Sequence, residues 1–286
     1  MPEPTAPVVV ATDGSPSATA AVRWAAADAA RRALPVLIVH VVERWPYGIS
    51  AFPPQGWQDA MAEAGDRVLT EAAQAATERT PGIDVTTELA GGTPADVLRE
   101  RAATATELVI GGRGTGGFAG ALLGSTVLRL AGHVRGAVVV VRAGQDGPGE
   151  EVVVGVDGST DGAAALGFAF EQARLRGAVL RALCAWHVPL RTVMPDSAHD
   201  VTGIQREQQR VVSERLAPWR EMYPGIEVVE EVTHGHPVSA LTDVSGRAAL
   251  LVVGSRGLGA VGSVVLGSVS RDVLQHARCP VAVVRP

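Results

Sequence analysis

The chain has 286 residues, of which 47% are hydrophobic and 19% are charged, with a formal net charge of −5 at pH 7. This length predicts two domains of roughly 150 residues, and the negative charge excludes a general attraction to nucleic acid or to an anionic membrane. No apolar run reaches the roughly 18 residues of a membrane span. All 25 basic residues are arginine, which excludes enzymes that need a lysine amine, such as Walker A nucleotidases, protein kinases and Schiff-base enzymes in their usual forms.

The cellular location is predicted from the N-terminus and the cysteines. The N-terminal stretch Met1–Pro4 carries no basic region ahead of an apolar core, so a secretory signal is not expected. The two cysteines, Cys184 and Cys279, give neither a disulfide framework nor a metal spacing. We therefore expect a cytoplasmic protein.

The first half of the chain alternates apolar strands with alanine-rich helices. An apolar strand over 8–12 meets Asp13, Gly14 and Ser15, where the serine hydroxyl and Pro16 favour the start of a helix. Apolar runs and helical periodicity predict the remaining elements. In chain order these are a helix over 17–33, a strand over 36–42, an irregular loop over 43–56, a helix over 57–79, a strand over 83–89, a helix over 94–104, a strand over 107–111, a helix over 124–134 and a strand over 137–142.

The second half repeats this rhythm, which indicates a duplicated domain. Its Asp157, in a second Asp-Gly-Ser turn, follows Asp13 by 144 residues, and the polar stretch 143–149 reads as the linker. We expect one domain over 1–146 and another over 147–286. The predicted elements are a strand over 151–156, a helix over 161–176, a strand over 178–185, a loop over 187–199, a helix over 201–222, a strand over 226–233, a helix over 237–247, a strand over 250–254, a helix over 267–277 and a strand over 280–285.

Strands that alternate with helices predict a parallel sheet covered by helices on both faces. Continuous Val, Ile and Leu runs are typical of strands buried on both sides. Open sheets of this kind bind ligands at the carboxyl ends of strands, where the strand order reverses. Asp13 and Gly111 both follow such strand ends, so we expect them to share a crevice.

One glycine pattern, Gly-x2-Gly-x9-Gly-Ser, occurs in each half. The first two glycines follow a buried strand, where a side chain would block a ligand. The final Gly-Ser pair opens a helix whose free amides and positive dipole end favour an anion, so the loop can cradle phosphate without lysine. Arg113 and Arg256 either add positive charge or face solvent. The pattern comprises Gly111, Gly114, Gly124 and Ser125, and again Gly254, Gly257, Gly267 and Ser268.

These paired motifs resemble the universal stress protein family in its tandem-domain form, over essentially the whole chain. The resemblance implies an α/β fold of two tandem Rossmann-like domains, each a five-stranded parallel sheet with helices on both faces. It also implies binding of ATP together with Mg²⁺. In the ATP-binding subgroup the first-strand aspartate lies near the ribose, the backbone of the second strand meets the adenine, and the glycine loop holds the phosphates.

Carried onto this sequence, the resemblance implies two sets of nucleotide-binding residues. The family's His-Val pair on the second strand matches His40 and Val41, whereas the aligned residue of the second half is Cys184. The first set is Thr12, Asp13, Val41, Gly111, Arg113, Gly114, Gly124, Ser125 and Thr126. The second set is Val156, Asp157, Cys184, Gly254, Arg256, Gly257, Gly267, Ser268, Val269 and Ser270.

The chain departs from the family in one place. The family often has a hydroxyl two residues after the Gly-Ser serine, which is Ser270 in the second half but Val127 in the first. The family also pairs domains through the last strand. Strands 137–142 and 280–285 would make that contact within one chain, which implies an intrachain pseudo-dimer that can itself form a homodimer.

Several of these residues also have ordinary structural explanations. Asp13 and Asp157 suit helix capping as well as ribose binding, and His40 lies in an apolar run typical of a core histidine. His234 and His236 have no third metal ligand nearby in the sequence, so a metal site is not expected. An aromatic group is expected to cover the nucleotide, form an interface or pack on a helix. It comprises Trp45, Tyr47, Phe52 and Trp57.

Three functions fit these residues. The first is a regulatory, ATP-binding stress-response protein whose nucleotide state controls assembly or binding to an unidentified partner, with at most slow ATP hydrolysis. The others are an ATP-using enzyme of the wider Rossmann-like nucleotide-binding group and a structural pseudo-dimer with vestigial sites. No catalytic residue is predicted, because the sequence has no recognisable nucleophile motif, metal-ligand cluster or kinase-like acidic motif.

Overall fold

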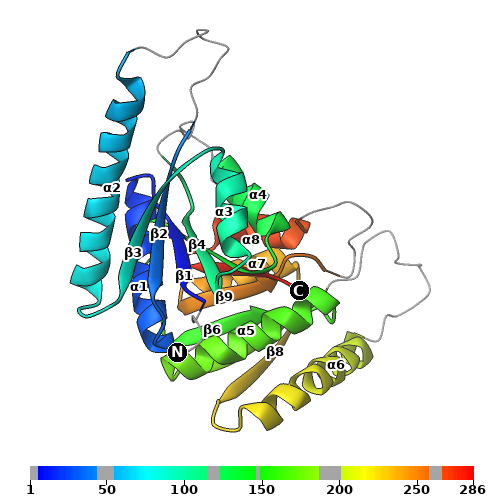
Figure 1. Ribbon diagram of the computed structural model, residues 1–286. Helices are drawn as coiled ribbons and strands as arrows, with labels where there is room; N and C mark the ends of the chain where they lie inside the picture. Colours follow the sequence, from blue (N-terminus) through cyan, green and yellow to red (C-terminus); the bar gives the residue numbers. More distant parts are fainter. Residues whose placement is uncertain (1–5, 44–54, 115–122, 146–148, 187–200, 258–265) are drawn as a thin grey trace. The chain divides into compact units, whose positions relative to one another are not determined.

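The computed structural model describes residues 6–43, 55–114, 123–145, 149–186, 201–257 and 266–286. The chain divides into two compact units, Met1–Asp146 and Gly147–Pro286, each built from strands and helices in alternation (Figure 1). Trp45, Tyr47 and Phe52 lie outside the described residues. None of the described helices is both long and apolar enough to cross a membrane.

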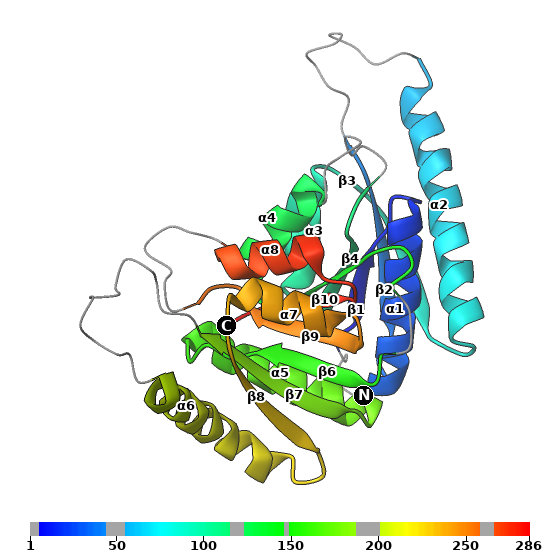
Figure 2. The same cartoon turned by 180° about the vertical axis from the view of Figure 1, so that it is seen from behind.

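The first unit is a parallel sheet with strand order β3-β2-β1-β4-β5. Helix α1 packs with α2, and α3 packs with α4, so that the two pairs cover opposite faces of the sheet (Figures 1 and 2). The elements in chain order are β1 (Val8–Ala11), α1 (Pro16–Arg32), β2 (Val36–Val42), α2 (Trp57–Arg79), β3 (Val85–Gly91), α3 (Pro94–Ala102), β4 (Glu107–Gly111), α4 (Ser125–His133) and β5 (Gly136–Val141).

The second unit repeats this topology, with strand order β8-β7-β6-β9-β10 and all described pairings parallel. Helix α5 packs with α6, and α7 packs with α8. The elements are β6 (Glu151–Gly155), α5 (Thr160–Arg176), β7 (Val179–Trp186), α6 (Val201–Met222), β8 (Val228–His234), α7 (Pro237–Ser245), β9 (Ala248–Gly254), α8 (Ser268–His276) and β10 (Val281–Arg285). The predicted α/β fold with two tandem Rossmann-like domains is therefore confirmed.

The strands and helices form for the reasons that the sequence suggested. Valines of the central strands are fully buried, as expected for a sheet covered on both faces. Ser15 caps α1 and Ser159 caps α5 through their side chains. The ends of these two helices differ, because the left-handed C-cap is Ala33 (φ 54°) in the first unit and Gly177 (φ 60°) in the second.

The element limits differ from the predictions by a few residues. Strand β3 is displaced by two residues from the predicted 83–89, because its pairing with β2 starts at Val36 and Val85 and runs to Gly91. Helix α3 ends at Ala102 rather than 104, since the following amides bond three residues back instead of four, as Thr104 does to the Arg101 carbonyl. Helix α7 likewise ends two residues early, at Ser245.

Strand order reverses between β1 and β4 in the first unit and between β6 and β9 in the second. Neighbouring loops leave the sheet in opposite directions at such a point, which opens a crevice at the carboxyl ends of the strands. Asp13 and the glycine loop after β4 therefore belong to the same edge of the first sheet. Asp157 and the loop after β9 are placed in the same way in the second.

Candidate functional site

The first site begins at the turn between β1 and α1. The Asp13 carboxylate accepts a hydrogen bond from the Ser15 amide (3.0 Å). The Ser15 hydroxyl accepts from the Ala18 amide (3.2 Å) and donates to the Arg113 carbonyl (3.1 Å). The capping serine therefore ties the aspartate turn to the glycine loop, across 98 residues of sequence.

The two glycines after β4 are required by close contacts with this turn. A Cβ at Gly111 would lie 2.8 Å from the Ala18 backbone nitrogen, so the first turn of α1 packs directly against the strand end. A Cβ at Gly114 would lie 2.5 Å from Oδ2 of Asp13. Any larger residue at either position must displace the helix or the carboxylate.

The start of α4 faces the same crevice. The Gly124 amide donates to the Gly112 carbonyl (3.0 Å), which fixes the start of the helix beside the loop. The next amides, of Ser125 and Thr126, have no partner within the helix because the first amides of an α-helix never do. Together with the positive end of the helix dipole they can bind an anion.

These groups line one cleft of about 600 Å³, a size that suits a small-molecule ligand. The cleft brings together every residue predicted for the first site: Thr12, Asp13, Val41, Gly111, Arg113, Gly114, Gly124, Ser125 and Thr126. Whether they hold a nucleotide stays a prediction.

His40 lies at this cleft. The sequence placed it both in the family's His-Val pair and in an apolar run typical of a core histidine. Its Nδ1 donates to the Thr12 carbonyl (2.7 Å), and the ring is partly exposed on the cleft wall. Val127 also lines the cleft. The signal for His40 was its position beside Val41 at the carboxyl end of β2, where ligands bind.

The second site repeats the same backbone frame. The Asp157 carboxylate accepts from the Ser159 amide (2.9 Å), and the Ser159 hydroxyl accepts from the Gly162 amide (3.0 Å) and donates to the Arg256 carbonyl (3.4 Å). A Cβ at Gly257 would lie 2.5 Å from Oδ2 of Asp157, as in the first site. The Gly267 amide donates to the Ser255 carbonyl (2.8 Å) before α8 begins.

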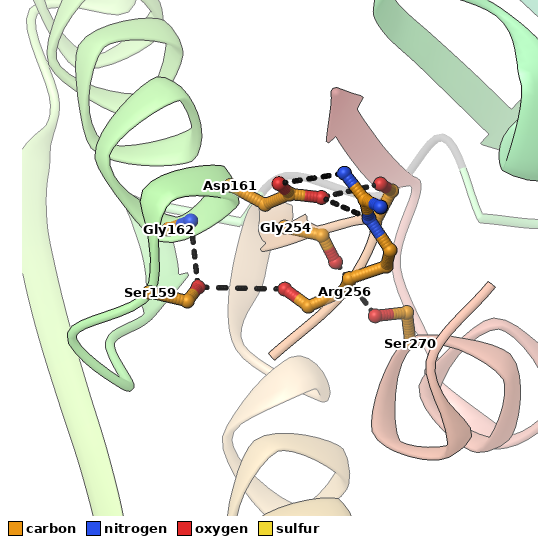
Figure 3. A network of polar contacts seen from close by, with 7 residues as sticks. Ser159, Asp161, Gly162, Gly254, Arg256 and Ser270 are labelled. Atoms are coloured by element: carbon orange, nitrogen blue, oxygen red, sulfur yellow. Dashed lines mark hydrogen bonds and ion pairs between the residues drawn. The ribbon is translucent and has the colours of Figure 1, made fainter. Parts of the chain in front are cut away.

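The side chains around this second frame are different. Asp161, in the first turn of α5, accepts a hydrogen bond from the Ser255 hydroxyl. It also accepts from the guanidinium of Arg256 (Figure 3). Arg256 was predicted as a site residue, but Asp161 and Ser255 were not. The available signal was an acidic residue in a first helical turn, though nothing in the sequence connects it to an arginine 95 residues later.

Several of the remaining residues predicted for the second site are buried or hydrogen-bonded within the protein. The Ser270 hydroxyl is buried and donates to the Gly254 carbonyl (2.6 Å). Cys184 and Val156 are buried. Burial, and then the negative charge of Asp157, raise the pKa of the Cys184 thiol, so the thiol is protonated at neutral pH. At the start of α8, Ser268 is exposed and Val269 is half-buried.

His234 and His236 have structural partners. Nδ1 of His236 accepts from the Val238 amide (3.3 Å) and so caps α7. The His234 ring packs edge-on against Trp186 at 4.8 Å. Across the described ranges, no group of three or more His, Cys, Asp or Glu side chains is arranged to hold a metal ion.

A larger hollow, of about 930 Å³, borders α3 and shares Glu43 with the cleft. Its wall consists largely of exposed side chains, such as Asp96, Arg99 and Glu100. Because ligand sites are built from a few converging polar groups in an apolar wall, the cleft at the strand ends is the better candidate.

Comparison with known proteins agrees with this architecture. A sequence profile of the Universal stress protein family matches residues 5–142 and, a second time, residues 150–285. A universal stress protein of Mycobacterium tuberculosis is 35% identical over 289 residues, which cover 97% of this chain and 96% of that protein. One from Mycolicibacterium smegmatis is 33% identical over 288 residues, which cover 98% of this chain and 97% of that protein.

Among solved structures, the crystal structure of a universal stress protein from Archaeoglobus fulgidus matches with a TM-score of 0.71. The match covers 98% of this chain and 96% of that chain at 21% sequence identity, so it shows the fold alone. The two profile matches and the full-length relatives show more. The chain belongs to the universal stress protein family and carries two tandem copies of its domain.

Proposed function

We propose that this protein binds ATP in each of its two units and that the bound nucleotide controls its assembly or its binding to a partner. One observation carries the proposal. A single cleft joins the Asp13 carboxylate, the Arg113 side chain and the first residues of α4. A carboxylate suits a ribose hydroxyl, whereas helix amides and an arginine suit phosphates.

The parts of ATP have natural positions in this proposal. The ribose meets Asp13, the adenine lies along β2 near Val41, and the phosphates meet the amides at Gly124, Ser125 and Thr126. The equivalent positions in the second unit are those of Asp157, Cys184 and the start of α8. Since the chain has no lysine, the positive charge that the protein itself offers to the phosphates comes from arginine and from the helix dipole.

Magnesium enters this proposal only with the nucleotide. Mg²⁺ is commonly held by one or two protein oxygens together with phosphates and water. Because Asp13 and Asp157 are placed at the ribose in this proposal, Mg²⁺ would be held mainly by the phosphates and by water. The hydroxyl of Ser270 already donates to the Gly254 carbonyl, so only its oxygen lone pairs remain available to a ligand.

We propose a regulatory output because the groups at the cleft bind and orient charge. Oδ1 of Asp13 is engaged by the Ser15 amide, and Nδ1 of His40 by the Thr12 carbonyl. Slow hydrolysis by a bound water is the upper limit of the proposed activity. The intrachain pseudo-dimer, a homodimer, a stress-response role and a cytoplasmic location stay predictions alongside it.

Nucleotide extraction and calorimetry test the proposal. Protein purified without added nucleotide is denatured, and the released nucleotide is identified by mass and counted per chain. Titration with ATP is then compared between wild type and the double variant Gly114→Ala, Gly257→Ala, in which each new methyl displaces an aspartate. We expect ATP binding by wild type and a loss of at least about tenfold in the variant. Equal affinity, or no binding by wild type, would contradict the proposal.

Two further measurements separate a regulator from an enzyme. Light scattering with and without ATP reports whether the nucleotide changes the oligomeric state. A single-turnover assay with labelled ATP reports whether product forms faster than in buffer. The proposal expects at most slow turnover, and rapid, glycine-dependent product formation would replace it with an ATP-using enzyme.

A further inference from the structure

The two sites differ at one position in the first turn of the helix that follows the aspartate. That position is Ser17 in α1 and Asp161 in α5, each the second residue of its helix. The contacts confirm the equivalence. A Cβ at Gly111 would lie 2.9 Å from the Ser17 carbonyl carbon, and one at Gly254 would lie 3.0 Å from the Asp161 carbonyl carbon.

In the second unit, Asp161 forms an ion pair with the loop arginine (Figure 3). Oδ2 of Asp161 accepts from the Ser255 hydroxyl (2.7 Å) and from Nε of Arg256 (3.2 Å), while Oδ1 accepts from Nη2 of Arg256 (3.4 Å). The residue is only 5% exposed. Burial alone would raise the pKa of this carboxyl, but the bonds from Ser255 and Arg256 outweigh it and hold the pKa below its usual range. Asp161 is therefore negative at neutral pH.

In the first unit this arrangement is missing. Gly112 stands where the second unit has Ser255, and Ser17 carries no charge. The Arg113 side chain is exposed and lines the cleft. Within the part of the chain that the structure describes, Arg113 has no carboxylate within ion-pair distance. The first cleft thus presents a positive charge that is already neutralised in the equivalent site of the second unit. That site, formed by Asp157, Gly257 and the start of α8, is called the second cleft by analogy.

A bound phosphate in the second cleft would face this ion pair. If Arg256 stays paired with Asp161, the phosphate gains no hydrogen bond from the arginine. If the phosphate draws Arg256 away, the buried carboxylate of Asp161 loses its cation. Both alternatives weaken binding, because charge-assisted hydrogen bonds are about twice as strong as neutral ones and an unpaired buried charge is costly. A ligand with no phosphate avoids both.

From these contacts, and resting on the proposed function, we infer that Asp161 is a specificity-determining residue that makes the two clefts unequal. It acts by holding Arg256 away from the phosphates. The second cleft therefore gains less affinity from each phosphate than the first. The first cleft is the tighter site for ATP, and the difference disappears for adenosine.

Residue exchange between the clefts tests this inference in the full chain. Gly114→Ala leaves only the second cleft unmodified, and Gly257→Ala leaves only the first. Calorimetry then measures ATP and adenosine binding before and after Asp161→Ser in the former background and Ser17→Asp in the latter. We expect Asp161→Ser to tighten ATP binding by about tenfold and Ser17→Asp to weaken it by about as much. Adenosine affinity is expected to change less than about twofold.

The outcomes separate the inference from the proposed function. If both clefts bind ATP but neither exchange alters its affinity, the inference is wrong and the proposed function stands. If Asp161→Ser changes ATP and adenosine affinity equally, the residue shapes the cleft and the inference is again wrong. If wild type and both single-cleft variants bind no ATP, the proposed function itself fails. Asp161→Asn, which keeps the shape but removes the charge, carries the test if the serine variant does not fold.

Discussion

The first turn of α1 and the first turn of α5 show how far the two halves of this protein have diverged. Both turns use a serine cap to attach an aspartate to a glycine loop, with donor–acceptor distances that agree within about 0.3 Å. The next side chains differ in charge, since Ser17 is uncharged and Arg113 is exposed, whereas Asp161 binds Arg256. The backbone that would hold a ligand is repeated, and its electrostatics are not.

The cores differ in the same way. Arg32, on α1, lies between two fully buried carboxylates, with Nε 2.8 Å from Asp28 and Nη2 3.6 Å from Glu107. Its counterpart Arg176, on α5, bonds the neutral side chain of Gln172. A leucine, Leu250, occupies the position of Glu107. The same fold therefore accommodates two carboxylates beside the arginine in the first unit, and an amide and a leucine at the equivalent positions of the second.

The largest expected effect compares these two arginines. Arg32→Met leaves two carboxylates buried without this cation, so it should lower the free energy of unfolding by about 3–5 kcal/mol. Arg176→Met removes a hydrogen bond to a neutral amide and should cost about 1–2 kcal/mol. Urea denaturation followed by circular dichroism measures both. Equal losses would show that the buried carboxylates do not distinguish the halves.

A compensating change sharpens this comparison. Glu107→Leu introduces the residue of the second half and removes one of the two carboxylates. Added to Arg32→Met, it should recover part of the lost stability, because it removes one of the two buried carboxylates that lost this cation. A further loss of stability would mean that a leucine at position 107 does not pack in the first unit as Leu250 packs in the second.

The next effect compares the glycines at the two strand ends. Gly111→Ala places a methyl 2.8 Å from a backbone nitrogen, whereas the closest atom at Gly254 is 3.0 Å away. Crowding of this kind costs about 1–3 kcal/mol, and we expect the loss to be larger at Gly111. Gly91→Ala is the matched control in the first unit, since a Cβ there meets nothing within 4 Å. Thermal unfolding of the three variants tests the order.

A smaller effect is expected where the two helices end. Ala33 holds a left-handed φ of 54°, which costs an L-residue about 1 kcal/mol, whereas Gly177 adopts φ 60° without strain. Ala33→Gly should therefore raise the free energy of unfolding by about 0.5–1 kcal/mol. Gly177→Ala should lower it by a similar amount. Stabilisation by both changes, or by neither, would contradict the assignment of strain to Ala33.

The smallest expected effect is the acid dependence of the second site. The folded-state pKa of Asp161 lies below its usual value, so its stabilisation is complete above the ordinary pKa of about 4 and is lost as pH falls through the lower folded value. The difference in Tm between wild type and Asp161→Asn should be constant from pH 8 to about pH 5 and shrink below about pH 4. Asp243→Asn, at an exposed carboxyl of α7, is the control. A difference that persists unchanged at pH 3 would show that charge is not involved.

Much of this architecture could be predicted from the sequence. Continuous valine runs and capped, alanine-rich helices predicted the order of strands and helices. The positions of Asp13 and Gly111 at strand ends predicted a shared crevice, and the family resemblance supplied the other residues that meet there. The exact ends of strands such as β3 could not be predicted, because they depend on the register of its pairing with β2. The pair of Asp161 and Arg256 could not be predicted, because it depends on how closely α5 approaches the end of β9, and no local pattern encodes that distance.

Equilibrium binding of ATP to the wild-type chain tests the central claim most directly: one backbone frame, used twice with different charges, holds the nucleotide phosphates. The account predicts two classes of site per chain, separated by about tenfold or more in Kd, with the tighter class lost in Gly114→Ala. A single class of two equal sites, or no ATP binding at either cleft, would contradict it.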